Sequence, residues 1–285
     1  MSNLAANLGL LRSLIIYYAL PWRRSSLARF YRELIPEGSL VFDVGAHVGS
    51  RTRSLLANGA HCVAIEPQPK FATLLQRIFK NNSRVTLVTD AVGRQPGKAE
   101  LHVSSRHPTV STLSSDWVSR VGKTSGFETV SWDQTVSVKV TTLDALIEQY
   151  GKPVFCKIDV EGMEAEILAG LSSAIPIVAV EYIPATIDIA LNCIDRLEAL
   201  GGYQYNLSQG ESHTMQFDSW LDEKAMRAEL KRIADNDITS GDLYARQIQN
   251  LELSSKPRSL RGRKNRASVI PFRVDFSAYL RSLAS

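Results

Sequence analysis

The feature that most constrains this chain is a regular alternation of short, continuously apolar runs with stretches of helical periodicity. The apolar runs fall at residues 40–46, 61–66, 85–92, 154–160 and 177–182. Strands that read as unbroken apolar runs are buried on both faces, and helices between them form parallel crossovers. Because such crossovers are right-handed, the helices cover both faces of the sheet. We therefore predict an α/β fold with a doubly wound, mostly parallel sheet.

This alternation defines one domain, which we place at residues 38–250. Residues 1–37 are expected to form an N-terminal helical extension. Residues 251–285 form a basic tail, partly disordered because its first half consists largely of Ser, Pro, Gly and basic residues. Within the domain, residues 99–144 are long for a connection, so we expect them to be either functional or mobile. Residues 219–233 are predicted to be helical, before a last short strand at 241–246.

The positive charge of the chain is concentrated at its ends. The net charge is +4, yet residues 1–32 hold five arginines and residues 256–266 hold six basic residues, with no acid in either segment. The residues between these ends therefore carry a net negative charge, which argues against a nucleic-acid partner for the domain. The apolar run at 14–20 is too short to span a bilayer. With its aromatic and basic neighbours it could make peripheral membrane contact, or it could pack on the domain or a partner.

The three cysteines give a further indication of the compartment. Cys62, Cys156 and Cys193 stand in apolar surroundings, without the spacing of a metal site or a redox pair. Buried thiols of this kind are typical of a reducing compartment. We therefore expect a cytoplasmic protein, with membrane contact limited to the periphery.

Acidic residues close three successive predicted strands. Asp43 precedes a turn that contains Gly45 and Gly49, Glu66 ends the second strand, and Asp90 lies near the end of the third. The glycines let the backbone approach a ligand, and the N–H groups that begin the next helix point toward it. A carboxylate about twenty residues beyond such a turn is placed to accept both hydroxyls of a ribose. The pattern therefore predicts a nucleotide-type ligand at this edge of the sheet.

The sequence of this turn indicates whether the nucleotide-type ligand is a dinucleotide. His47 interrupts it, so the G-x-G-x-x-G pattern of dinucleotide-binding enzymes is absent. A NAD-dependent oxidoreductase is accordingly the weaker alternative.

A second acidic cluster follows on the fourth and fifth strands. Lys157, Asp159 and Glu161 recur at every second position, so their side chains can share one face, and Glu181 ends the next strand. A carboxylate there can act as a general base. We expect Asp159 or Glu161 to be this base, Glu181 to support it, and Lys157 to lower the pKa of its neighbours. Two alternatives stay open: the acids could bind Mg²⁺ or Mn²⁺, or they could form a structural ion pair with the lysine.

Several motifs of the chain resemble those of the FkbM family of S-adenosylmethionine-dependent methyltransferases. They are Phe42-Asp43-Val44-Gly45-Ala46, Ala64-Ile65-Glu66-Pro67, Ala91-Val92-Gly93, Thr142-Leu143-Asp144, Lys157-Ile158-Asp159-Val160-Glu161-Gly162, Val180-Glu181-Tyr182 and Gly241-Asp242-Leu243-Tyr244-Ala245. The lysine-containing motif is the specific one, since the glycine turn is common to Rossmann-like class I methyltransferases. The resemblance covers about residues 38–247. His47 stands where the family usually has Asn.

The resemblance implies S-adenosylmethionine as the cofactor. The residues it implies in cofactor binding are Asp43, Gly45, His47 and Gly49 for the methionine part, Glu66 for the ribose, and Asp90 and Ala91 for the adenine. Known members are mostly O-methyltransferases of sugars and natural products. O-methylation of a hydroxyl on a small-molecule or glycan acceptor is therefore the leading function. The remaining alternative is a non-catalytic nucleotide-binding module that its basic ends tether to a membrane or partner.

The long insert at 99–144 is expected to contribute on the acceptor side. Ser111-Thr112-Leu113 resembles a short family pattern, which implies a lid over the substrate. His107 lies in the same Ser/Thr-rich segment and could contact the acceptor.

Overall fold

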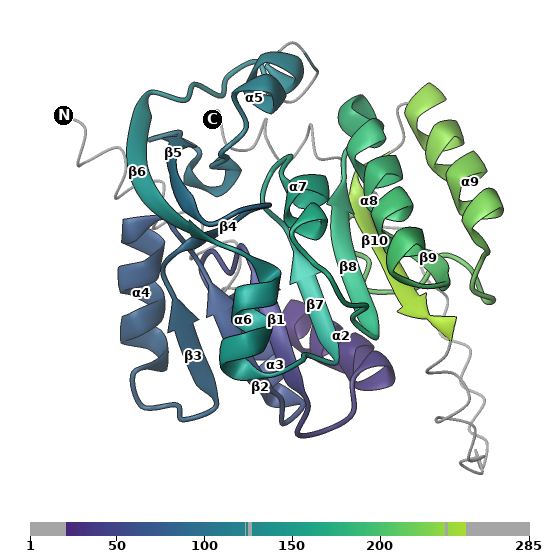
Figure 1. The fold of residues 1–285 in the computed structure, drawn as a ribbon, viewed down its shortest axis with the longest axis horizontal. Helices are drawn as coiled ribbons and strands as arrows, with labels where there is room; N and C mark the ends of the chain where they lie inside the picture. The colour runs from purple at the N-terminus through teal and green to yellow at the C-terminus, as the bar shows by residue number, and fades with distance from the viewer. Residues whose placement is uncertain (1–20, 123, 125–126, 237–238, 249–285) are drawn as a thin grey trace.

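The computed structural model describes residues 21–122, 124, 127–236 and 239–248. A seven-stranded sheet with the order β3-β2-β1-β7-β8-β10-β9 forms its centre (Figure 1). The strands are β1 (Leu40–Val44), β2 (His61–Ile65), β3 (Val85–Val88), β7 (Phe155–Ile158), β8 (Ile177–Tyr182), β9 (Tyr203–Gln209) and β10 (Gly241–Gln247). The five strands from β3 to β8 pair in parallel. The predicted α/β fold with a doubly wound, mostly parallel sheet is confirmed.

Strand β10 breaks the parallel pattern, because it runs antiparallel between β8 and β9. The sequence predicts β10 but not β9, although the buried residues Tyr203, Tyr205 and Leu207 alternate along it. Gly241 at the start of β10 pairs with Tyr182 and Gln209 at the ends of β8 and β9. The start of β10 therefore lies where the parallel strands end, on the side that we call the carboxyl edge.

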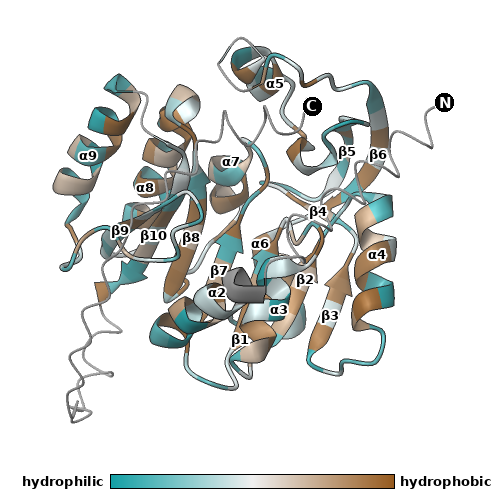
Figure 2. Cartoon of the chain, turned by 180° about the vertical axis from the view of Figure 1, so that it is seen from behind, coloured by the Kyte–Doolittle hydropathy of each residue, from teal (hydrophilic) through white to brown (hydrophobic). Residues whose placement is uncertain are grey.

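Helices cover both faces of the large sheet. Those in front of it in Figure 1 are α6 (Leu143–Tyr150), α7 (Glu164–Ala169), α8 (Ile187–Leu200) and α9 (Glu223–Asp235). Their apolar residues join the larger core cluster, as Leu146, Ile194 and Leu230 illustrate. The opposite face is covered by α2 (Pro21–Leu34), α3 (Ser50–Ala57) and α4 (Pro69–Phe79). Figure 2 shows α2 and α3 in front of apolar strands from this side.

Local sequence signals set the bounds of several helices. The hydroxyl of Thr142 accepts the N–H of Ala145 at 3.1 Å and begins α6. Asp222 caps α9 in the same way, so this helix begins later than the predicted residue 219. Pro69 occupies the first turn of α4, where a missing N–H group costs nothing.

The insert at 99–144 contributes to a second, smaller sheet. Strands β4 (Ala91–Val92), β5 (Gly97–Val103) and β6 (Gln134–Thr141) pair in the order β4-β6-β5, and α5 (Ser115–Val121) lies between β5 and β6 in the chain. Figure 1 shows this sheet and α5 above the carboxyl edge. The predicted single strand at 85–92 is therefore wrong. The chain leaves the large sheet after Val88, level with the last residue of β2, and Ala91 and Val92 pair with β6 instead.

The described part of the N-terminal extension is helix α2 together with residues 35–37. Leu27, Phe30 and Tyr31 are buried in the core cluster beneath it. The apolar run at 14–20 and the tail at 251–285 lie outside the described residues. In the part of the chain that the structure describes, no helix has both the length and the apolar character needed to cross a membrane. The three cysteines are buried and free, as predicted.

Candidate active site

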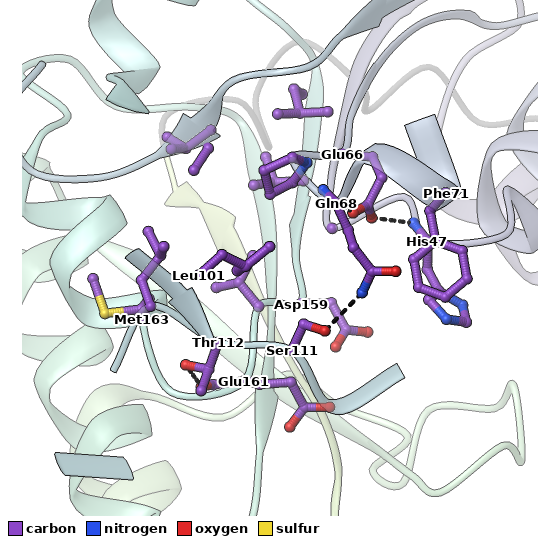
Figure 3. A pocket seen from close by; sticks show the side chains of 18 of the residues that line it. His47, Glu66, Gln68, Phe71, Leu101, Ser111, Thr112, Asp159, Glu161 and Met163 are labelled. Carbon is purple, nitrogen blue, oxygen red and sulfur yellow. Dashed lines mark hydrogen bonds between the residues drawn. The ribbon is translucent and has the colours of Figure 1, made fainter. Parts of the chain in front are cut away.

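A pocket opens at the carboxyl edge, between the ends of β1, β2 and β7 and the segment after β5 (Figure 3). Figure 3 shows His47 and Phe71 on one side of it, and Leu101 and Met163 on the other. The predicted site residues that line it are Gly45, His47, Glu66, Ala91, Asp159 and Glu161. Those that do not line it are Asp43, Gly49, Asp90, Lys157 and Glu181. Carboxyl ends of parallel strands meet at one edge, which is why residues so distant in sequence share this pocket.

The turn after β1 depends on close backbone approach. Gly45 has φ 83°, and a Cβ added there would overlap the carbonyl oxygen of Asp159. Glycine is thus required both by the conformation and by the neighbouring loop. His47 has φ 52°, a left-handed conformation in which Asn, Asp and His are enriched among non-glycine residues. The replacement of the family's Asn by His is therefore compatible with the turn.

Glu66 closes β2 and faces the pocket with its carboxylate. Oε2 accepts the backbone N–H of His47 and Oε1 that of Gln68, each at 2.8 Å. Burial raises the pKa of Glu66 to about 7, against the opposing effect of these two hydrogen bonds. A carboxylate offers about four lone-pair sites, so the two backbone bonds leave acceptor positions for two further donors. This capacity fits the two hydroxyls of a ribose.

Asp43 lies behind the pocket wall and is fully buried. Thr52 donates a hydrogen bond to its Oδ2 at 2.5 Å, whereas Oδ1 has no hydrogen-bond partner among the described residues. Burial raises its pKa, and the bond from Thr52 opposes that rise. Gly49 packs against Leu75 and Phe79, so it shapes the turn without facing the pocket.

Asp90 occupies the connection between β3 and β4, outside the lining, while Ala91 after it lines the pocket.

The loop after β7 carries the second group of predicted residues. The predicted strand at 154–160 is too long, because β7 ends at Ile158. Asp159 still donates its N–H to the carbonyl of Val44 at 3.0 Å, and the chain then turns through Glu161 at φ 58°. Strand alternation therefore does not govern the direction of Glu161. The buried carboxylate of Glu164 accepts the N–H of Val160 at 3.1 Å and so holds the loop in place.

Two cations and two carboxylates meet beside the pocket in what we call the ion network. Lys157 Nζ lies 2.7 Å from Asp242 Oδ1 and 3.3 Å from Asp159 Oδ2. Arg51 spans the same acids, with NH2 3.1 Å from Asp159 Oδ2 and NH1 3.5 Å from Asp242 Oδ2. Burial works to raise the pKa of Asp159, but the charges of Lys157 and Arg51 outweigh it and hold that pKa below its usual range. Asp159 is therefore the ionised carboxylate of the pocket.

Glu161 and Glu181 behave in the opposite way. Burial and repulsion from Asp159 raise the pKa of Glu161 well above its usual value. The pKa of Glu181 rises for the same reasons, with Glu161 as a further repelling charge. These carboxyl groups can therefore hold or accept a proton near neutral pH.

Hydrogen bonds join the insert to the loop after β7 and to the start of α4. Thr112 Oγ1 donates to the carbonyl of Glu161 at 2.6 Å, and Gln68 Nε2 donates to Ser111 Oγ at 2.7 Å (Figure 3). Trp117 of α5 packs directly on Gly162, and Arg120 pairs with Asp188 of α8 at 2.9 Å.

The predicted lid residues Ser111, Thr112 and Leu113 thus line the pocket. His107 is buried but does not line it.

The described residues contain no group of three or more His, Cys, Asp or Glu side chains arranged to hold a metal ion. The acids beside the pocket are spread over several elements, and two of them already bind Arg51 and Lys157.

A family model described as the methyltransferase FkbM domain matches residues 43–217, which is more than half of the chain. The chain belongs to the FkbM methyltransferase family. This membership carries S-adenosylmethionine as the methyl donor, and the acceptor positions left on Glu66, which lines the pocket, can accommodate its ribose. It gives no support to the oxidoreductase alternative. No curated protein matches the chain significantly.

Solved structures similar to this FkbM chain are distant in sequence. A precorrin-6Y C5,15-methyltransferase from Geobacter metallireducens is 12% identical, covers 79% of this chain and 87% of its own, and has a TM-score of 0.41. An rRNA methylase from Streptococcus thermophilus is 12% identical, covers 78% and 94%, and has a TM-score of 0.40. An S-adenosylmethionine-dependent O-methyltransferase from Thermotoga maritima is 12% identical, covers 82% and 70%, and has a TM-score of 0.39.

Sequence reasoning missed two residues of the ion network, Arg51 and Asp242. Arg51 stands on α3 among other polar residues, and nothing in its spacing distinguishes it from a surface arginine. Asp242 lies in the motif at 241–245, but the motif alone assigns it no role. An acid that begins a late apolar strand was the available signal for it.

Proposed function

We propose that this FkbM methyltransferase transfers the methyl group of S-adenosylmethionine to a hydroxyl group of a sugar or natural product. The observation that carries the proposal is the joint placement of Glu66, Asp159 and Glu161 in one pocket at the carboxyl edge. Glu66 suits the ribose of the donor, and the two other acids suit an acceptor that must lose a proton. The acceptor is a small molecule or glycan, since the acidic lining disfavours nucleic acid.

Within this proposal the chain's own residues bind and orient the donor. Glu66 accepts the ribose hydroxyls and Ala91 borders the adenine, whereas Asp90 lies outside the pocket lining. The turn of Gly45, His47 and Gly49, with Asp43 behind it, holds the methionine part. When bound, S-adenosylmethionine supplies an electrophilic methyl group on a sulfonium. Alignment of donor and acceptor then provides most of the catalysis, because in-line displacement needs little covalent help.

The acceptor hydroxyl loses its proton to a carboxylate of the second acidic group. Asp159 and Glu161, which line the pocket, are the candidate bases; Glu181 supports them, and Lys157 tunes them through its charge. A positioned base of this kind contributes a factor of 10²–10⁴ in rate. Mg²⁺ or Mn²⁺ is a second candidate for activating the hydroxyl, and the dispersed acids give it less support than they give a base.

Calorimetry with S-adenosylhomocysteine tests the donor site. We expect Glu66→Ala to weaken binding by about 2–4 kcal/mol, because charge-assisted hydrogen bonds to two ribose hydroxyls are lost. Glu148→Ala is the matched control, since Glu148 is an exposed acid on α6, away from the pocket. Equal affinities of wild type and Glu66→Ala would remove Glu66 from the site.

The acceptor class needs a separate assay. Methyl transfer from radiolabelled donor to a panel of sugars and hydroxylated natural products should label hydroxyl oxygen. Labelling that survives EDTA treatment supports the base, whereas loss on EDTA and recovery with Mg²⁺ supports the metal. Donor binding together with labelling of nitrogen or carbon acceptors alone would overturn O-methylation.

We also propose a compartment for the enzyme and a role for its basic ends. We place the enzyme in the cytoplasm, with peripheral contact to an anionic membrane through residues 1–37 and 251–285.

A further inference from the structure

The carboxylates that line the pocket have no cation beside them in the lining. They belong to Glu66, Asp159 and Glu161, and no lysine or arginine of the described part of the chain lines the pocket. His47 also lines it, but its ring is uncharged at neutral pH, because burial lowers its pKa to about 3. The described lining therefore offers negative charge to a ligand and no positive charge.

Asp159 and Glu66 stand on either side of the turn after β1. The last residues of β1, β2 and β7 pair with one another across the sheet, so the residues that follow them, Gly45, Glu66 and Asp159, lie at one level. The backbones of Glu66 and Asp159 are thus two strand spacings apart, about 10 Å. Asp159 adjoins the turn itself, because its N–H donates to the carbonyl of Val44 at 3.0 Å and a Cβ on Gly45 would overlap its carbonyl oxygen.

This placement assigns the two acids to different parts of the donor. Under the proposed function Glu66 binds the ribose and the turn at Gly45 holds the methionine part. The sulfur joins these two parts of the molecule. Asp159 therefore borders the part of the pocket in which S-adenosylmethionine carries its positive charges.

The ion network fixes the carboxylate of Asp159 from outside the pocket. Arg51 NH2 lies 3.1 Å and Lys157 Nζ 3.3 Å from Oδ2, and neither cation lines the pocket. Asp242 binds both cations in turn, at 3.5 Å and 2.7 Å. Burial opposes the charge of Asp159, but the two cations outweigh burial and hold its pKa below the usual range. Asp159 is therefore an ionised group in a set position, and its side chain is still 21% exposed.

The donor and its product differ by one charge. S-adenosylmethionine carries a positive sulfonium, whereas S-adenosylhomocysteine has a neutral sulfur, because the electrons of the broken carbon–sulfur bond stay on sulfur. A fixed carboxylate in a partly buried site attracts a cation more strongly than it would in water, since the effective dielectric constant is lower.

We propose that Asp159 is a specificity-determining residue of the donor site, which strengthens the binding of positively charged S-adenosylmethionine relative to neutral S-adenosylhomocysteine. Arg51, Lys157 and Asp242 are the positioning residues that hold it. The proposal rests on the proposed function, because it requires this pocket to bind the donor. Methyl transfer removes the charge that Asp159 attracts, so the product lacks this attraction. The role does not depend on which carboxylate takes the proton of the acceptor.

Calorimetry with three ligands tests the proposal without knowledge of the acceptor. The ligands are S-adenosylmethionine, S-adenosylhomocysteine and sinefungin, which carries an amine on carbon in place of the sulfonium and so separates charge from the methyl group on sulfur. The quantity measured on the full chain at neutral pH is the Kd of S-adenosylhomocysteine divided by that of each charged ligand. Asp159→Asn keeps the size of the side chain and removes its charge. We expect it to lower both ratios by about three- to tenfold, the effect of one partly solvated charge interaction.

Asp235→Asn is the matched control. Asp235 is an exposed acid at the end of α9, which packs beside β9 at the far end of the sheet from β2. The same loss of charge at this position should leave both ratios unchanged.

Variants of Arg51 test the ion network in the opposite direction. Arg51→Met removes a positive charge beside Asp159 and leaves the carboxylate ionised by Lys157, so both ratios should rise. Arg51→Lys should return them to the wild-type values. A purely structural role of Arg51 would weaken all three ligands alike and leave the ratios in place. If Asp159→Asn fails to fold, the Arg51 variants still decide.

The outcomes distinguish failure of this inference from failure of the proposed function. If none of the three ligands binds, the proposed function fails, and the inference fails with it. If they bind with equal ratios in wild type and Asp159→Asn, the role of Asp159 is refuted while the donor site stands. A ratio that falls for S-adenosylmethionine and not for sinefungin would show that Asp159 senses the methyl group and not the charge, which also refutes the proposal.

Discussion

A substitution of Gly162, which contacts Trp117, should lower the free energy of unfolding through a steric cost and a conformational cost that can be measured separately. Gly162 has φ 98°, and a Cβ added there would overlap Cγ and Cδ1 of the indole and lie 2.8 Å from the Cβ of Trp117. Trp117 is only 1% exposed and cannot simply swing into solvent. Gly162→Ala therefore combines a strained backbone with an overpacked contact.

The two costs can be estimated separately. A left-handed conformation costs a non-glycine residue about 1–2 kcal/mol. Forcing a methyl group into a packed contact costs about 1–3 kcal/mol more. We expect Gly162→Ala to lower the free energy of unfolding by about 3 kcal/mol, which for a domain of this size lowers Tm by about 6–12 °C.

Gly38→Ala is the matched control for the backbone cost. Gly38 has φ 77°, and an added Cβ would meet nothing within 4 Å. Urea unfolding followed by circular dichroism should give about 1–2 kcal/mol for Gly38→Ala and a clearly larger loss for Gly162→Ala. Equal losses in the two variants would refute the argument that α5 is seated on the loop after β7.

Three other measurements follow from the structure and a fourth from the sequence. Burial raises the pKa of Glu66 from 4.5 in the unfolded chain to about 7. The contribution of Glu66 to stability is therefore complete below pH 4.5 and is lost as pH rises through 7, a loss of about 3 kcal/mol. Urea unfolding of Glu66→Gln between pH 4.5 and 8 should lack this pH dependence. Thr52→Val should lower the free energy of unfolding by about 1–3 kcal/mol, because it removes the hydrogen bond to the buried Asp43; an unchanged urea midpoint would contradict that bond. Arg120→Ala should cost less than about 1 kcal/mol, since its pair with Asp188 is exposed, and a larger loss in the same assay would show that this pair fastens the insert. The full chain should sediment with anionic vesicles. Replacing the six basic residues of 256–266 by glutamine should weaken vesicle binding by about 1 kcal/mol for each charge that reaches the membrane surface. No sedimentation of the wild type would refute the membrane proposal.

The sequence correctly predicted features that depend on a single strand, such as its position and the acid at its end. Apolar runs located the parallel strands, and the acids at their ends located the carboxyl edge. Glu66, Asp159 and Glu161 came together in one pocket because parallel strands all end on the same side of a sheet.

Features that depend on several elements at once could not be predicted. The partners of Lys157 depend on the register of β10 against β8, and no local pattern encodes that register. Arg51 gains its role only when α3 packs beside the loop after β7. The direction of Glu161 follows from a left-handed turn held by Glu164, which overrides the alternation expected of a strand.

The position of β10 has a consequence for how the protein is made. The acid that completes the ion network, Asp242, lies on the last strand of the sheet, although the cations it binds belong to α3 and β7. Synthesis runs from the N-terminus, so β1, β7 and β8 leave the ribosome well before β10. Because a domain folds as a unit, burial of the Lys157 amine between Asp159 and Asp242 requires the chain as far as β10. A translation stop before residue 242 therefore yields a chain that contains the pocket-lining residues and lacks the acid that completes the ion network.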